Sequence, residues 1–151
     1  RLLLADALTF SQESKIKNDF VIDFATLTGA ARVALGTELP ALFTNDTNLG
    51  KMIIKEGKDQ IDPMWELPLF TPYERFLENK YDALSSTGTA GTGGAITAAL
   101  FLKKFVNVDT NWAHIDLMAW NTSGRPGFPA GGEAMGLRNI VNMIIKYCNQ
   151  K

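Results

Sequence analysis

Hydrophobic residues along the chain alternate between two spacings, and this alternation predicts an α/β domain. Short apolar runs rich in β-branched and aromatic residues are typical of buried strands. The predicted strands span residues 20–25, 41–45 and 112–120. Stretches that repeat apolar residues every three or four positions are typical of amphipathic helices. The predicted helices span residues 1–8, 48–60, 72–79, 95–106 and 137–147, with a brief helical turn at 31–36.

The helix at 137–147 closes the chain, and its apolar residues predict which side faces the core. Ile140, Val141, Ile144 and Ile145 lie on one side of this helix, and we expect them to be buried. No internal repeat or linker divides residues 1–151, so the alternating helices and strands predict one domain.

Composition limits the classes of function. A net charge of -1 gives no electrostatic reason to expect nucleic acid or an anionic membrane as a partner. No apolar run approaches the roughly 18 residues that span a bilayer. Cys148 is the only cysteine, so no internal disulfide can form, and a cytoplasmic location is the natural expectation.

Only one histidine is available for chemistry. His114 alternates with apolar residues in a predicted strand, beside Asp116. A metal site needs three or four protein ligands, and no partners are visible at ligand spacing, so we interpret His114 as a core imidazole with a hydrogen bond to a neighbour. Asp23 lies inside another predicted strand, and we expect it to have a specific hydrogen-bond partner. These residues alone do not predict an active site.

The glycine-rich stretch at 85–94 has two interpretations. Because a helix follows it, it resembles a phosphate-binding loop at a helix N-terminus. It lacks the Lys-Ser/Thr ending of a P-loop and does not directly follow a strong hydrophobic strand. A surface loop on the substrate side of a site is therefore the favoured interpretation.

Several segments, in order, resemble the M17 leucyl aminopeptidase family. That family has a metal-binding segment reading Asn-Thr-Asp-Ala-Glu-Gly-Arg-Leu, and Arg1 and Leu2 match its last two letters. The other matching segments are residues 25–30, 43–45, 65–69, 94–102 and 112–116. The resemblance covers nearly the whole chain, and its strength lies in the order and spacing of these segments.

The resemblance implies a mixed, mostly parallel sheet between helices, as the C-terminal part of an M17-type catalytic domain over residues 1–151. It implies a two-metal exopeptidase that removes leucine-like N-terminal residues from peptides and assembles as a homo-hexamer. The two divalent ions, zinc or manganese, would be bound mainly by residues upstream of Arg1. This chain would then hold no metal itself, and we expect it to be inactive alone.

The resemblance also implies site residues. Arg1 would be catalytic, because its guanidinium can hold an anion such as the bicarbonate proposed as general base in the family. Thr26, Leu27 and Gly29 match positions that line the substrate cleft. Gly29 suits such a turn because it lets another backbone approach closely.

Met118 and Asn121 depart from the family's common pattern. They stand where the family places residues that floor the pocket for the first substrate side chain, after a strand usually followed by Ala-Gly. Two other functions remain open at this point. The chain could belong to a non-enzymatic family member that binds DNA or other partners, although its charge argues against nucleic acid. It could also be an unrelated α/β domain used for protein association.

Overall fold

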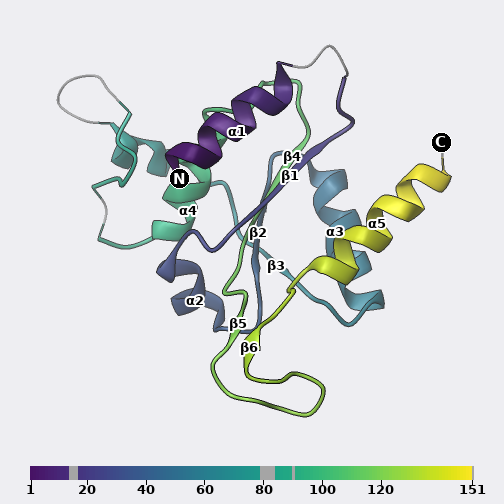
Figure 1. The fold of residues 1–151 in the computed structure, drawn as a ribbon. Helices are drawn as coiled ribbons and strands as arrows, with labels where there is room; N and C mark the ends of the chain where they lie inside the picture. The colour runs from purple at the N-terminus through teal and green to yellow at the C-terminus, as the bar shows by residue number, and fades with distance from the viewer. Residues whose placement is uncertain (14–16, 79–83, 90, 151) are drawn as a thin grey trace.

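The computed structural model describes residues 1–13, 17–78, 84–89 and 91–150 and confirms an α/β domain (Figure 1). Its helices are α1 (Leu2–Gln12), α2 (Gly29–Leu35), α3 (Thr47–Asp59), the 3₁₀ helix η1 (Thr71–Leu77), α4 (Gly94–Lys103) and α5 (Leu137–Asn149). Its strands are β1 (Val21–Ala25), β2 (Ala41–Thr44), β3 (Trp65–Glu66), β4 (Trp112–Asp116), β5 (Trp120–Asn121) and β6 (Gly131–Gly132). No helix in this described part of the chain is long and apolar enough to cross a membrane.

Four strands form a mixed sheet in the order β1-β4-β2-β3. Strand β4 is central, parallel to β1 and antiparallel to β2, and the short β3 runs parallel to β2. Five consecutive pairs join β1 to β4, from Val21 opposite Trp112 to Ala25 opposite Asp116. The carboxyl ends of β1 and β4 therefore lie side by side at one edge of the sheet.

Helices cover both faces of the sheet (Figure 1). Helices α3 and α5 pack on one face, where Ala113 and Ile115 of β4 point. Helices α1, α2, α4 and η1 cover the other face, where Trp112 points. Successive residues of β4 face opposite sides, as in any strand, and all five are buried because both sides carry helices.

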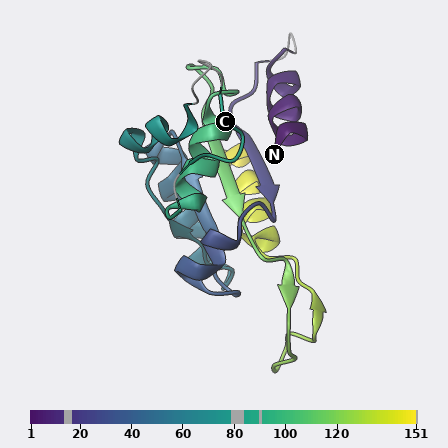
Figure 2. The same cartoon turned by 90° about the vertical axis from the view of Figure 1, so that its left-hand side faces the viewer.

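Strand β4 is shorter than predicted. The sequence predicts a strand to residue 120, whereas β4 ends at Asp116. Ala119 has a φ of 56°, a left-handed conformation that interrupts an extended strand. Trp120–Asn121 then pairs with Gly131–Gly132 in a separate two-stranded ribbon that projects from the body (Figure 2). Met118 consequently lies in a loop rather than in the sheet.

Two helices also differ from expectation. The helix predicted at 72–79 is the 3₁₀ helix η1, and its predicted last residue lies outside the described part of the chain. Helix α5 is rotated relative to the prediction. Ile140 is buried as predicted, whereas Val141, Ile144 and Ile145 are exposed, and Met143 is buried beside Ile140.

The side of α5 that faces the core is set by a capping carboxylate. Asp62, which follows α3, accepts hydrogen bonds from the amides of Gly136 (2.9 Å) and Asn139 (3.1 Å). Asn139 is fully buried and its side-chain amide donates to the Asp62 carbonyl at 3.2 Å. A carboxylate at a helix N-terminus is favourable electrostatically, and here it also fixes the rotation of the helix.

A buried polar group joins β1 to β4. Asp23 Oδ1 lies 2.5 Å from His114 Nδ1, and Asp23 Oδ2 accepts from Trp112 Nε1 at 2.7 Å. His114 is fully buried, with its ring near those of Phe43 and Trp112. Its Nε2 has no hydrogen-bond partner among the described residues, so the proton sits on Nδ1, where Asp23 accepts it. The interpretation of His114 as a core imidazole and the expectation of a partner for Asp23 are both confirmed.

Replacing Asp23 with Ala should destabilise the fold strongly. Two buried donors, on His114 and Trp112, would lose their acceptor at once, and such a loss costs roughly 2–4 kcal/mol. Urea unfolding followed by circular dichroism measures this free energy. The control variant Asp109→Ala removes an exposed carboxylate and should change stability by less than about 0.5 kcal/mol. Equal effects of the two substitutions would show that the buried hydrogen bonds are dispensable.

Candidate substrate-binding pocket

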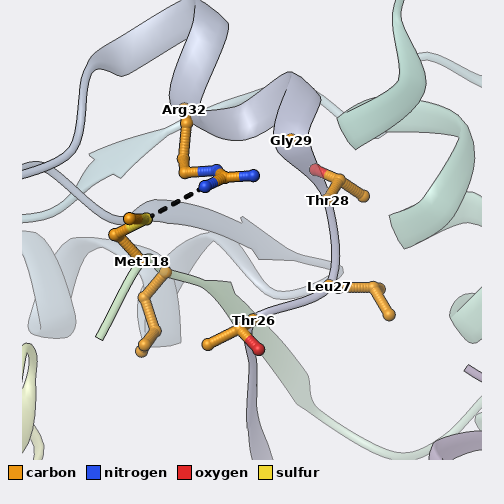
Figure 3. Close-up of a pocket in the computed structure, with 7 residues that line it drawn as sticks. Thr26, Leu27, Thr28, Gly29, Arg32 and Met118 are labelled. Carbon is orange, nitrogen blue, oxygen red and sulfur yellow. Dashed lines mark hydrogen bonds between the residues drawn. The ribbon is translucent and has the colours of Figure 1, made fainter. Parts of the chain in front are cut away.

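A pocket of about 370 Å³ lies where the parallel strands β1 and β4 end (Figure 3). The chain leaving β1 and the chain leaving β4 form its walls. Its lining residues are Thr26, Leu27, Thr28, Gly29, Arg32, Leu117 and Met118. Crevices beyond the carboxyl ends of parallel strands are common binding sites, because the loops that follow neighbouring strands converge there.

The carboxylate of Asp116 joins the two walls of this pocket. Its Oδ1 accepts from the amides of Leu27 (3.0 Å) and Thr28 (3.2 Å), and its Oδ2 accepts from the Thr28 hydroxyl at 2.6 Å. Asp116 is 1% exposed, so these bonds lie away from water, where the loss of one is costly. They hold the turn after β1 against the end of β4.

Thr28 also begins helix α2. Its hydroxyl oxygen accepts from the amide of Ala31 at 3.1 Å, which makes Thr28 the N-cap of the helix. The same hydroxyl donates to Asp116, so one side chain fixes both the turn and the direction of α2. The amide of Gly29 is in the first helical turn and has no acceptor within the helix.

Helix α2 brings a charged side chain to the pocket. Arg32 Nη1 lies 3.2 Å from the sulfur of Met118 on the opposite wall (Figure 3). The site residues predicted from the sequence do not include Arg32, Thr28 or Leu117. A signal for Arg32 was present: it lies one helical turn after Gly29, so a helix starting at the turn places the two on the same side.

The sequence-predicted site residues do not all meet in one place. Thr26, Leu27, Gly29 and Met118 line the pocket together. Asn121 does not line it. Asn121 is 4% exposed, and its side-chain amide donates to the Pro129 carbonyl (3.1 Å) and to Glu133 (2.7 Å) within the β5–β6 ribbon.

Arg1 lies on the far side of the turn, between α4 and the glycine-rich loop. Its guanidinium donates to the Ser86 carbonyl and lies 5.9 Å from the ring centroid of Phe101. Burial lowers the pKa of Arg1, and the negative charge of Asp116 acts in the opposite direction. Arg1 stays cationic, because a guanidinium pKa is far above neutral. A positive charge therefore lies within electrostatic reach of the carboxylate that organises the pocket.

The glycine-rich loop packs against η1. The amides of Ser85 and Thr89 donate to the carbonyls of Leu77 (2.6 Å) and Phe76 (2.9 Å). These two amides are therefore already bonded within the protein, whereas a phosphate-binding loop points its amides at the ligand.

The described residues do not form a metal site. No group of three or more His, Cys, Asp or Glu side chains within the described ranges is arranged to hold an ion. The buried carboxylates of Asp23 and Asp116 are both committed to hydrogen bonds within the protein. A metal ion at this pocket would need ligands from outside these ranges.

Comparison with known proteins identifies one family. The family model described as the cytosol aminopeptidase family, catalytic domain, matches residues 1–141. The chain is 40% identical over 151 residues to a protein named "Probable cytosol aminopeptidase" from Synechococcus sp. (strain WH7803), covering 99% of this chain and 30% of that protein. A protein of the same name from Prochlorococcus marinus (strain MIT 9211) is 42% identical, with the same coverage.

Solved structures agree in fold. The cytosol aminopeptidase of Coxiella burnetii superposes with a TM-score of 0.90 at 46% identity, covering 96% of this chain and 31% of that one. The bottromycin maturation enzyme BotP, in a complex with Mn, has a TM-score of 0.88 at 32% identity, covering 97% of this chain and 33% of that one. The chain thus spans about 30% of the length of the curated relatives that it matches.

Replacing Thr28 with Val should destabilise the protein by about 1–2 kcal/mol. The substitution keeps the shape of the side chain but removes the hydroxyl that caps α2 and bonds Asp116. Thr28→Ser keeps the hydroxyl and should cost clearly less. Denaturant unfolding of both variants gives the comparison, and equal losses in Val and Ser would mean that the hydroxyl does not hold the turn.

Proposed function

Because the chain belongs to the cytosol aminopeptidase (M17) family, we propose that the intact protein is a metal-dependent aminopeptidase. Its substrates are peptides, from which it removes leucine-like N-terminal residues. The observation that carries this proposal is the pocket after β1 and β4, lined by Thr26, Leu27 and Gly29 within the family match. No observation on the described residues favours a DNA-binding role.

We further propose that residues 1–151 are the C-terminal portion of a single catalytic domain. The match to only about 30% of each of these two relatives supports the view that the chain corresponds to a portion of a longer protein. Two divalent ions, zinc or manganese, would be held mainly by residues outside this chain, and the manganese in the BotP complex supports a divalent ion. We also propose that the intact protein assembles as a homo-hexamer and lies in the cytoplasm. The relatives' name, cytosol aminopeptidase, supports the proposed location.

Within this proposal, the residues of the chain bind and orient the peptide. The Gly29 amide and the Leu27 carbonyl are suited to hydrogen-bond the peptide backbone, while Asp116 keeps the turn rigid through the Leu27 and Thr28 amides. Met118 contacts the first substrate side chain, and its flexible thioether adapts to apolar groups. Asn121 acts from outside the pocket, in the β5–β6 ribbon, whose shape its hydrogen bonds to Glu133 and Pro129 maintain.

The bound metal ions would activate a water molecule and polarise the scissile carbonyl. Arg1 contributes a fixed positive charge. A planar guanidinium can hold an anion such as bicarbonate through two parallel hydrogen bonds, and bicarbonate held there would accept a proton as general base. The contacts of Arg1 with the Ser86 carbonyl and the Phe101 ring would hold the arginine side chain in place.

The intact protein should hydrolyse leucine p-nitroanilide when manganese or zinc is present. EDTA should abolish the activity, and added metal should restore it. The isolated 151-residue chain, checked for folding by circular dichroism, should be inactive because its described residues offer no metal site. Metal-dependent turnover by the isolated chain would contradict the placement of the ligands outside it.

Replacing Arg1 with Ala in the intact protein should lower kcat by about 10²–10³-fold, with a smaller change in KM. The reason is that a charge placed for the transition state acts mainly on the rate of the chemical step. Arg1→Lys should restore only part of the rate, since an ammonium cannot hold an anion through two parallel bonds. Steady-state kinetics on leucine p-nitroanilide decide the matter, and unchanged turnover in Arg1→Ala would remove Arg1 from the mechanism.

A further inference from the structure

We propose that Arg32 binds a carboxylate of the peptide substrate, so that this pocket accepts substrates with an acidic group in addition to those with leucine-like N-terminal residues. This inference rests on the proposed aminopeptidase function and adds a specificity-determining residue to the same site. Arg32 is exposed and lies on the first turns of α2, with its guanidinium over the pocket (Figure 3).

The position of Arg32 follows from the way α2 begins. Thr28 is tied to Asp116 and caps the helix, so the helix axis is fixed relative to the end of β4. Arg32 then reaches back across the turn. Its Nη2 lies above Gly29, where an added methyl group would come within 3.4 Å of it. Its Nη1 meets the Met118 sulfur at 3.2 Å on the other wall.

Among the described residues that line the pocket, Arg32 is the only one with a charged side chain. The six other lining residues are neutral, and no carboxylate of the described chain forms an ion pair with Arg32. The nearby carboxylate of Asp116 is already bonded to Leu27 and Thr28. The guanidinium of Arg32 therefore has no ion-pair partner among the described residues.

The contact with Met118 leaves the binding capacity of Arg32 almost intact. A thioether sulfur is a weak acceptor, whereas a guanidinium carries five N–H donors in a planar fork. A carboxylate matches this fork with two parallel hydrogen bonds and an opposite charge, so it is a much better partner than sulfur. The unbranched Met118 side chain can move aside as a carboxylate enters.

Two parts of a peptide carry such a carboxylate. One is the side chain of an N-terminal Asp or Glu, and the other is the free C-terminus of a dipeptide. A pocket of about 370 Å³ has room for either group. The two sources share the same chemistry toward Arg32, and different substrates separate them.

The test uses the intact, metal-loaded protein with three substitutions at one position: Arg32→Gln, Arg32→Lys and Arg32→Glu. Lys51→Gln is the control, because it removes an exposed positive charge from α3 that does not line the pocket. One arm compares glutamate p-nitroanilide with leucine p-nitroanilide, which have no C-terminal carboxylate. The other arm compares the dipeptide Leu-Gly with its C-terminal amide. The readout is the ratio of kcat/KM within each arm.

Arg32→Gln should lower the acidic-to-neutral ratio about tenfold in the arm that carries the recognised carboxylate, mostly through KM, since a charged hydrogen bond binds substrate and transition state alike. Arg32→Lys should keep part of the ratio. Arg32→Glu should lower it further, which a merely structural role of Arg32 would not do. If the recognised carboxylate is the N-terminal side chain, Arg32→Glu should also raise the relative rate on lysine p-nitroanilide. The ratios in Lys51→Gln should match those of the unsubstituted protein.

The outcomes separate this inference from the function on which it rests. Suppose that both ratios in Arg32→Gln and Arg32→Glu stay within twofold of those of the unsubstituted protein while leucine p-nitroanilide is still cleaved. Arg32 then does not bind a substrate carboxylate, and the aminopeptidase function stands. If the intact metal-loaded protein cleaves none of the substrates, the proposed function is wrong, and the role of Arg32 falls with it.

Discussion

The hydrogen bonds between Asp116 and the turn after β1 tie together two chain segments that lie about ninety residues apart in the sequence. Parallel strands cannot be joined by a short hairpin, so their carboxyl ends meet only because the intervening chain crosses over. Once β1 and β4 are paired, the buried carboxylate at the end of β4 lies opposite the amides of Leu27 and Thr28. The pocket, the start of α2 and the reach of Arg32 all depend on that contact.

A second buried carboxylate supports the same strand pair from within. Asp23 lies opposite His114 in the register and binds both its ring and that of Trp112. His114 and Asp116 are two residues apart on β4, so they point to the same face of the sheet. The central strand thus carries two polar groups on a face otherwise packed with apolar helices. Each of these two polar groups has its hydrogen-bond partner on β1 or on the turn that follows β1. These bonds favour the observed register of β1 against β4 over a register shifted by one residue.

Two arginines flank the turn and serve different purposes in the proposed enzyme. Arg1 is partly buried, bonded to the Ser86 carbonyl and close enough to Asp116 for its pKa to be affected. Arg32 is exposed, and among the described residues its guanidinium makes a side-chain contact with the sulfur of Met118 on the pocket wall. A buried, well-positioned cation suits a fixed electrostatic role, whereas an exposed one with unused donors suits recognition of a varying substrate group.

The sequence by itself determined the fold class, the order of most elements and the location of the key turn. Hydrophobic spacing reports the fold class and the order of elements because burial on one face or on both faces of an element leaves a local periodic trace. The turn was located by the resemblance of residues 25–30 to the M17 family. It also indicated that Asp23 needs a partner, since a carboxylate inside an apolar strand cannot stay unpaired.

Tertiary structure alone decided where β4 ends, which side of α5 is buried and which residues share the pocket. Val141 and Ile144 were predicted to be core residues from the apolar side of the helix, whereas the structure buries the side that carries Asn139, which is hydrogen-bonded to Asp62. Asn121 follows Met118 closely in sequence, yet the left-handed Ala119 sends it into a separate ribbon. The physical reason is common to these cases: contacts between distant segments have no local periodic signature, so they exist only after the chain has folded.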